Sequence, residues 1–125
     1  MIISVYNRPG KRKEDEIKLF EELEVVMGRF RSKYKRGEII VVGDLNKTIE
    51  QLKRMRKECS GIERLLEMSW GVVGKTSIKR VGTDNVENVQ IDHMFSERST
   101  KWVKKTEPGE FGTDHSLIVG DVMIL

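Results

Sequence analysis

The sequence has little cysteine and no long apolar run. Cys59 is the only cysteine among 125 residues, so the chain can form neither an internal disulfide nor a cysteine-based zinc site. A single cysteine favours a reducing, intracellular compartment, cytoplasmic or nuclear. The longest apolar runs span four or five residues, too few for a transmembrane helix, and the first residues lack the basic start of a signal peptide. We therefore expect no membrane association.

Proline and aromatic residues are also scarce. Two prolines, Pro9 and Pro108, interrupt the chain, and 6% of its residues are aromatic. Charged residues make up 34%, and 23 basic against 20 acidic residues give a net charge of +3. This charge is compatible with a polyanionic partner, although it more often reflects solubility alone. Without a linker or repeat, residues 1–125 are expected to form one unit.

Hydrophobic periodicity predicts helices that alternate with strands. Apolar residues at steps of three and four predict a helix over 14–35, with its acidic first turn in solvent and Gly37 as its C-cap. The β-branched run over 38–42 predicts a strand buried on both faces. Other expected elements are helices over 48–58 and 61–67, capped by Thr48 and Ser60, strands over 2–6, 89–95 and 117–125, strand or loop over 70–73 and 76–81, and a loop over 109–113. The class is α/β or α+β, a mixed sheet flanked by helices.

Three acidic motifs lie at the edges of the predicted strands. They are Asp44 with Asn46, Asp92 with His93, and Asp114 with His115. Ligand sites gather at strand ends, and a carboxylate buried there needs a cation, a hydrogen-bond donor or water. Taken singly, each motif has an ordinary explanation: an Asx turn at Asp44, a solvent-facing edge-strand pair at Asp92, and a turn or helix cap at Asp114.

The order and spacing of these motifs resemble those of the endonuclease/exonuclease/phosphatase superfamily. That group includes abasic-site endonucleases, endonuclease domains of non-long-terminal-repeat retrotransposons, DNase I-like nucleases and inositol-phosphate phosphatases. The resemblance covers nearly the whole chain. Residues 4–9 are similar to the family's strand that ends in Tyr before a Pro loop, and residues 39–46 are similar to its Gly-Asp-aromatic/Leu-Asn motif. Residues 91–95 are similar to its Ile-Asp-His/Tyr strand, and residues 113–116 are similar to its Ser-Asp-His motif. It implies a DNase I-like four-layer α/β sandwich.

The resemblance also implies a role for each motif residue in magnesium-dependent, nuclease-like phosphodiester hydrolysis. Asp44 would orient or deprotonate the attacking water or bind metal, and Asp114 would help hold the metal. Asn46 would bind a phosphate oxygen, His115 would contact the scissile phosphate, and Tyr6 would point its hydroxyl at the phosphate. Asp92 would hold the His115 ring. An oxygen-ligand site suits Mg²⁺, with Mn²⁺ as a substitute. Nucleic acid is the expected partner. Abasic DNA, duplex DNA, RNA and phosphoinositides all stay open as substrates.

The chain matches only the second half of that family's fold. The first half carries an Asn and a Glu that is a principal metal ligand, and residues 14–16 follow the Tyr6 strand on a solvated helix start, so they cannot supply that Glu. Two alternatives therefore stay open. One is a catalytically inactive half-domain that acts as an interaction module. The other is half of a split enzyme, in which a partner chain or a second copy covers the open sheet face.

Other features have ordinary explanations that we favour. Residues 71–76 are similar to a phosphate-binding loop, but Ser69 replaces its first glycine and no helical pattern follows. His93 is expected to be a packed or exposed histidine instead of a metal ligand. The expected solvated helix face, which could instead touch phosphates, comprises Lys53, Arg54, Arg56 and Lys57. Trp70 and Trp102 are expected to pack in the core or at its rim instead of stacking on bases.

Overall fold

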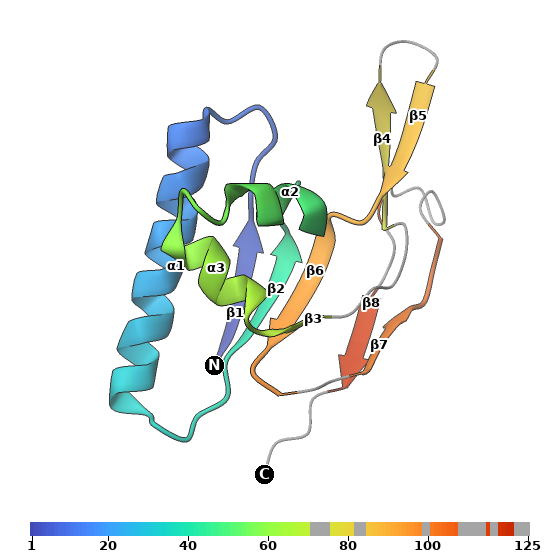
Figure 1. Cartoon of the computed structure of the whole chain (residues 1–125). Helices are drawn as coiled ribbons and strands as arrows, with labels where there is room; N and C mark the ends of the chain where they lie inside the picture. The colour runs from blue at the N-terminus through green and yellow to red at the C-terminus, as the bar shows by residue number, and fades with distance from the viewer. Residues whose placement is uncertain (71–75, 82–84, 99–100, 108–114, 116–117, 122–125) are drawn as a thin grey trace.

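The computed structural model describes residues 1–70, 76–81, 85–98, 101–107, 115 and 118–121 (Figure 1). Its centre is a four-stranded mixed sheet in the order β1-β2-β6-β3. The strands are β1 (Ile2–Tyr6), β2 (Ile40–Asp44), β6 (Asp92–Ser96) and β3 (Ser69–Trp70). β1 runs parallel to β2, and the other two pairs are antiparallel. The predicted class, a mixed sheet flanked by helices, is confirmed.

Two smaller sheets accompany the central one. β4 (Ser77–Val81) pairs with β5 (Asn85–Val89), and β7 (Lys101–Lys104) pairs with β8 (Ile118–Asp121), both antiparallel. In Figure 1 the β4–β5 pair projects past the end of the sheet where β2 ends and β6 begins, and the β7–β8 pair lies beyond β6, on the opposite side from α1. The expected strand over 89–95 is therefore the end of one strand and the start of another. β7 was not expected, and β8 falls within the predicted final strand, whose residues 117 and 122–125 lie outside the described residues.

The helix α1 (Lys13–Lys33) connects β1 to β2. A parallel strand pair needs such a crossover, and the acidic first turn and basic last turn match the helix dipole. The helix ends at Tyr34, whose N–H donates to the Phe30 carbonyl at 2.8 Å. Gly37 lies beyond this end and does not have a positive φ, so the predicted glycine C-cap is wrong.

The short helices α2 (Ile49–Met55) and α3 (Ser60–Leu66) follow β2. Thr48 caps α2 as predicted, in a capping box in which Thr48 and Gln51 each bond the other's backbone N–H. The predicted Ser60 cap is wrong, because Cys59 occupies that position. Instead, the Ser60 hydroxyl donates to Glu24 on α1 at 2.6 Å. The bond ties α3 to α1.

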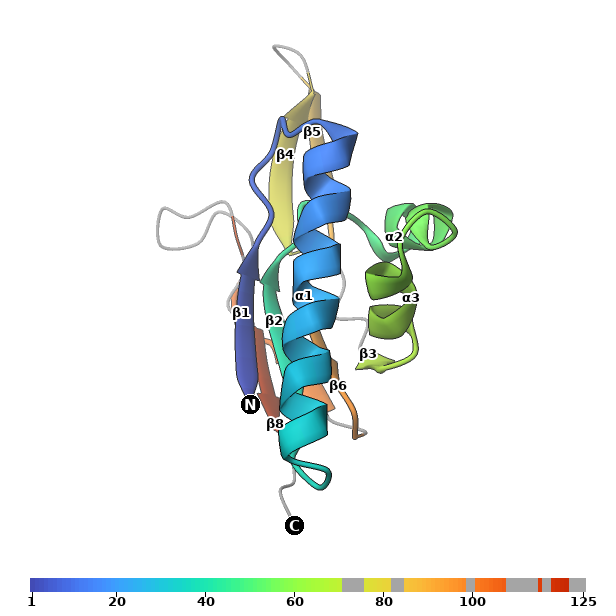
Figure 2. The ribbon, with the colours of Figure 1, turned by 90° about the vertical axis from the view of Figure 1, so that its left-hand side faces the viewer.

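The helices pack on one face of the sheet, and α1 and α3 lie close together (Figures 1 and 2). Gly61 permits this approach, because a Cβ at that position would lie 2.2 Å from the Phe20 carbonyl oxygen. The core cluster comprises Val5, Phe20, Leu23, Met27, Ile39, Val41, Leu45, Leu52, Cys59, Ile62, Leu65 and Phe95. No helix in the described part of the chain is long and apolar enough to cross a membrane.

The two faces of the sheet differ in cover. Along β1 the side chains alternate, with Val5 buried toward the helices and Ile2 and Tyr6 on the other face, 72% and 63% exposed. Asp92 and His93 are not a pair facing solvent, because His93 is buried and Asp92 is half-buried. His93 faces the helix side and is buried, which fits the expected packed histidine. Asp92 faces the other side.

Candidate functional site

Three of the predicted site residues are direct neighbours across the sheet. The register pairs Tyr6 with Asp44, and Asp44 with Asp92. Residues opposite one another share a face, so the three side chains start from the same end of the same face, away from the helices. Two of these strands end there and the third begins there, which explains why residues far apart in sequence meet.

His115 joins this group from a distant part of the chain. A β-bridge to Ser77 holds its backbone beside the start of β4. Its Nδ1 lies 2.7 Å from Asp92 Oδ2, and its Nε2 lies 3.7 Å from Asp44 Oδ2. Asp44, Asp92 and His115 each offer a ligand atom within 4.8 Å of the others. The ring therefore lies between two carboxylates and bonds one of them.

The pKa of Asp44 is raised above its ordinary value by the surroundings of its carboxyl group. Burial raises the pKa of Asp44, the Asn46 backbone N–H lowers it, the facing Asp92 raises it, and His115 lowers it. Like charges placed opposite each other on neighbouring strands destabilise a sheet. A cation between them relieves that repulsion, and an imidazolium or a metal ion would each serve.

The donor set fits a hard divalent cation in part. Mg²⁺ prefers oxygen ligands, which Asp44 and Asp92 supply, whereas imidazole nitrogen suits other metals better. Because His115 bonds Asp92 Oδ2, it is placed as the partner of a carboxylate and not as a magnesium ligand. Asp44 and Asp92 would therefore hold the cation. Asp114, also predicted to bind metal, lies outside the described residues.

The loop after Asp44 is fixed by short hydrogen bonds. Asn46 has a φ of 49°, in the left-handed region, and its N–H donates to Asp44 Oδ1 at 2.9 Å. This is the Asx turn that we gave as the ordinary explanation of the motif, and it coexists with the carboxylate pair. The Asn46 amide nitrogen donates to the Asn7 carbonyl. One amide hydrogen of Asn46 is thus used, and the second has no partner among the described residues.

Asn7 connects the ends of β1 and β2 and was not singled out from the sequence. It is fully buried, its N–H donates to the Asp44 carbonyl at 2.9 Å, and its side-chain amide donates to the Leu45 carbonyl at 2.8 Å. Gly43 allows the two strands to meet here, because its φ is 148° and a Cβ would lie 1.8 Å from the Val5 carbonyl oxygen. These contacts fix the backbone on both sides of Asp44.

Thr76 is a second residue that the sequence reasoning missed. It is fully buried, and its hydroxyl oxygen accepts from the backbone N–H groups of Ile91 at 3.1 Å and Asp92 at 3.2 Å. The next residue, Ser77, forms the bridge to His115. Residues 76 and 77 therefore connect both members of the Asp92–His115 pair. Thr76 drew notice only as the end of the phosphate-loop-like stretch, whose residues 71–75 lie outside the described residues.

The structure also bears on the expected exposure of three groups of side chains. The residues expected on a solvated helix face are all exposed, namely Lys53, Arg54, Arg56 and Lys57. The first turn of α1 is not wholly solvated as expected, because Glu16 is buried and forms an ion pair with Lys47 at 3.1 Å. Trp70 is half-buried on β3, as expected for packing at the rim of the core. The side chain of Trp102 lies outside the described residues.

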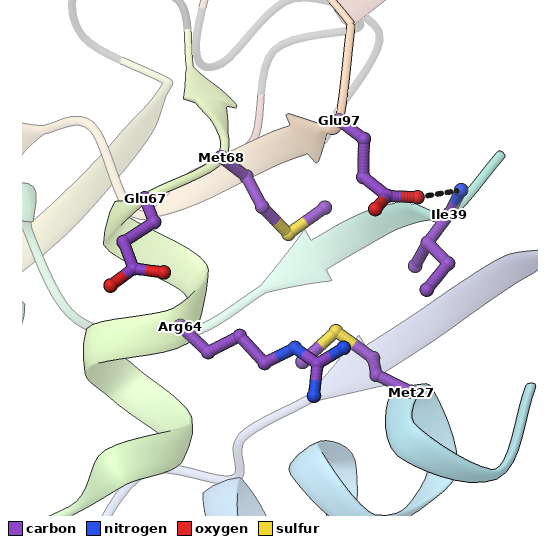
Figure 3. A pocket seen from close by; sticks show the side chains of 6 residues that line it. All are labelled: Met27, Ile39, Arg64, Glu67, Met68 and Glu97. Carbon is purple, nitrogen blue, oxygen red and sulfur yellow. Dashed lines mark hydrogen bonds between the residues drawn. The ribbon is translucent and has the colours of Figure 1, made fainter. Parts of the chain in front are cut away.

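A hollow lies at the opposite end of the sheet. Its volume is about 240 Å³, and Figure 3 shows its lining, Met27, Ile39, Arg64, Glu67, Met68 and Glu97. Glu97 is already engaged there, since it accepts from the Ile39 N–H at 2.9 Å and pairs with Arg31. None of the predicted site residues lines it. It is also smaller than the roughly 300–1,000 Å³ of common ligand pockets.

Comparisons with known proteins add no further guide. No protein-family model, curated protein or solved structure matches the chain.

Proposed function

We propose that the chain is the C-terminal half of an endonuclease/exonuclease/phosphatase domain that hydrolyses phosphodiester bonds with Mg²⁺, in a DNase I-like fold. The observation that carries this proposal is the meeting of Asp44, Asp92 and His115 at one end of the sheet face that the helices leave uncovered. These three residues come from three of the four motifs that resemble one family, and Tyr6 of the fourth motif lies in register with Asp44. Their convergence supports the assignment.

In this proposal each group would have a distinct task. Asp92 accepts from Nδ1–H of His115, and Nε2 lies 3.7 Å from Asp44 Oδ2, so a doubly protonated ring would donate from Nε2 to a phosphate oxygen on that side. Asp44, with its raised pKa, is suited to take a proton from an attacking water. The second amide hydrogen of Asn46 would donate to a phosphate oxygen. Tyr6 lies in register with Asp44 on the same open face. Bound Mg²⁺ would supply charge neutralisation of the phosphate oxygens.

Nucleic acid is the substrate class that we propose. A net charge of +3 and the four exposed cations at and after the end of α2 are compatible with a polyanion. The test is nicking of supercoiled plasmid by the full chain, with Mg²⁺ and with EDTA. Asp44→Asn and His115→Gln should each lower the rate by about 100-fold or more, because each removes an acid–base group. Glu21→Gln, an equal charge change on the exposed face of α1, is the matched control and should leave the rate unchanged.

A second candidate is half of a split enzyme, completed by another chain or a second copy. The exposed Ile2 and Tyr6 on the uncovered face of β1 favour it. Light scattering separates the candidates. A monomer that nicks plasmid at a rate proportional to its concentration supports the first. A dimer, or activity that appears only with an added partner, supports the second, and a monomer inactive with every phosphoester substrate leaves an interaction module.

A further inference from the structure

The buried ring of His93 is bonded on both of its nitrogens. Trp70 Nε1 lies 2.8 Å from Nδ1, and the Lys47 carbonyl oxygen lies 2.7 Å from Nε2. An indole N–H only donates, so Nδ1 must accept, and a carbonyl oxygen only accepts, so Nε2 must carry the proton. Both partners independently require the same neutral tautomer. His93 is 3% exposed, so water does not compete for either bond.

The Lys47 carbonyl that His93 holds is the last group of the loop that begins at Asp44. Inside the loop, Asn46 adopts a left-handed backbone, a conformation that asparagine tolerates better than most residues. After it, Thr48 starts α2 with a capping box. Lys47 is held a second time by its ammonium group, which pairs with Glu16 on α1. The loop is therefore fixed at its start by Asn7 and at its end by His93.

Simple packing does not require this arrangement. A phenyl or aliphatic side chain would fill the same space between Trp70 and Phe95, whose rings lie 5.7 Å and 5.8 Å from that of His93. A histidine adds a directional bond from the interior of the sheet to the loop. Trp70 adds the donor that keeps the ring from flipping. The pair thus connects β6, which carries Asp92, to the loop that begins at Asp44.

We infer that Trp70 and His93 are a positioning pair: the indole fixes the ring of His93, and the ring fixes Lys47, so that the loop of residues 44–47 keeps Asp44 opposite Asp92. The holding of the loop stands on its own, and its effect on catalysis rests on the proposed function. Neither residue touches the reacting atoms.

The tautomer is tested first, by long-range ¹H–¹⁵N NMR of the full chain. The chain has two histidines, so the spectrum of His93→Phe assigns the remaining signal to His115. We expect His93 to show a protonated Nε2 and a bare Nδ1 at neutral pH. A protonated Nδ1, or rapid exchange between tautomers, would overturn the inference.

The holding of the loop is tested by amide hydrogen exchange at Asn46, whose N–H bonds Asp44 Oδ1. Trp70→Phe keeps an aromatic ring but removes the donor together with part of the indole, so exchange should become about tenfold faster or more. His93→Gln, which can still donate to the Lys47 carbonyl, should exchange more slowly than His93→Phe. Tyr34→Phe, at the far end of α1, should match the wild type. Asn46 exchange in Trp70→Phe within about twofold of wild type would contradict the inference.

The catalytic consequence is measured on the same proteins. Displacing the loop should lower kcat for plasmid nicking by about tenfold or more in Trp70→Phe, with KM within about twofold, because misplacement of a catalytic group affects the transition state most. Faster Asn46 exchange with an unchanged kcat would refute this effect. If the wild type cleaves no phosphoester, the proposed function fails, and the exchange experiment still decides whether Trp70 and His93 hold the loop.

Discussion

Replacing Thr76 with valine removes a buried hydroxyl and leaves the shape of the side chain nearly unchanged. The hydroxyl oxygen accepts from two backbone N–H groups, those of Ile91 and Asp92, at 3.1 and 3.2 Å. In the variant both groups lose that acceptor in a place that water does not reach, since Thr76 is fully buried. Each buried donor without a partner costs about 1–3 kcal/mol, and bonds of this length belong at the lower end. We expect a loss of about 2–4 kcal/mol in the free energy of unfolding.

The assay for Thr76→Val is urea denaturation at neutral pH, with Thr76→Ser as the control. Serine keeps the hydroxyl and loses one methyl group, which costs about 1 kcal/mol. The valine variant should therefore be the less stable of the two, although it is the more apolar. Folded domains are stable by about 5–15 kcal/mol, so the expected loss is easily measured. A valine variant as stable as the serine variant would refute the role assigned to the hydroxyl.

Two other predictions concern the same end of the sheet. Gly43→Ala should lower the free energy of unfolding by about 2–4 kcal/mol, because the added Cβ would meet the Val5 carbonyl oxygen and Gly43 has a positive φ. Gly28 lies in open space on α1, so Gly28→Ala should raise the free energy of unfolding by about 0.5–1 kcal/mol. Equal effects of the two substitutions in denaturation would contradict this. Burial lowers the pKa of His93, so the unfolded chain protonates first as the pH falls. Stability from the neutral ring is thus complete above about pH 6.5 and is lost as the pH falls through the lower pKa of the folded state. In EDTA, denaturation between about pH 7 and pH 5 should show a smaller loss for His93→Gln than for the wild type, and equal losses would exclude a neutral buried ring.

Local pattern was enough to predict much of the fold. The apolar spacing of α1, the β-branched run of β2 and the Thr48 cap each depend on residues close together in sequence. The meeting of Asp44 with Asp92 was also predictable, since acidic residues that border buried strands share a sheet edge once those strands pair. Tyr6 reached its register position beside Asp44 for the same reason.

The features that sequence could not supply depend on long-range contacts. Ser60 is a good cap by type, yet its hydroxyl bonds Glu24, thirty-six residues earlier, and the helix begins at Ser60 itself. Glu16 looked solvated, because nothing local shows that Lys47 will fold over it. The break between β5 and β6 follows from Thr76 bonding Ile91 and Asp92, a contact with no signature in the spacing of residues. The pairing of Trp70 with His93 is equally invisible until β3 and β6 lie side by side.

The most direct test of the catalytic assignment is the rate of magnesium-dependent plasmid nicking by Asp92→Asn. Asparagine keeps the size of the side chain but removes the charge that holds the His115 ring at Nδ1. We predict a rate about 100-fold or more below that of the wild type, with the free energy of unfolding nearly unchanged. A variant that nicks plasmid as fast as the wild type would contradict the account of Asp44, Asp92 and His115 as one hydrolytic site.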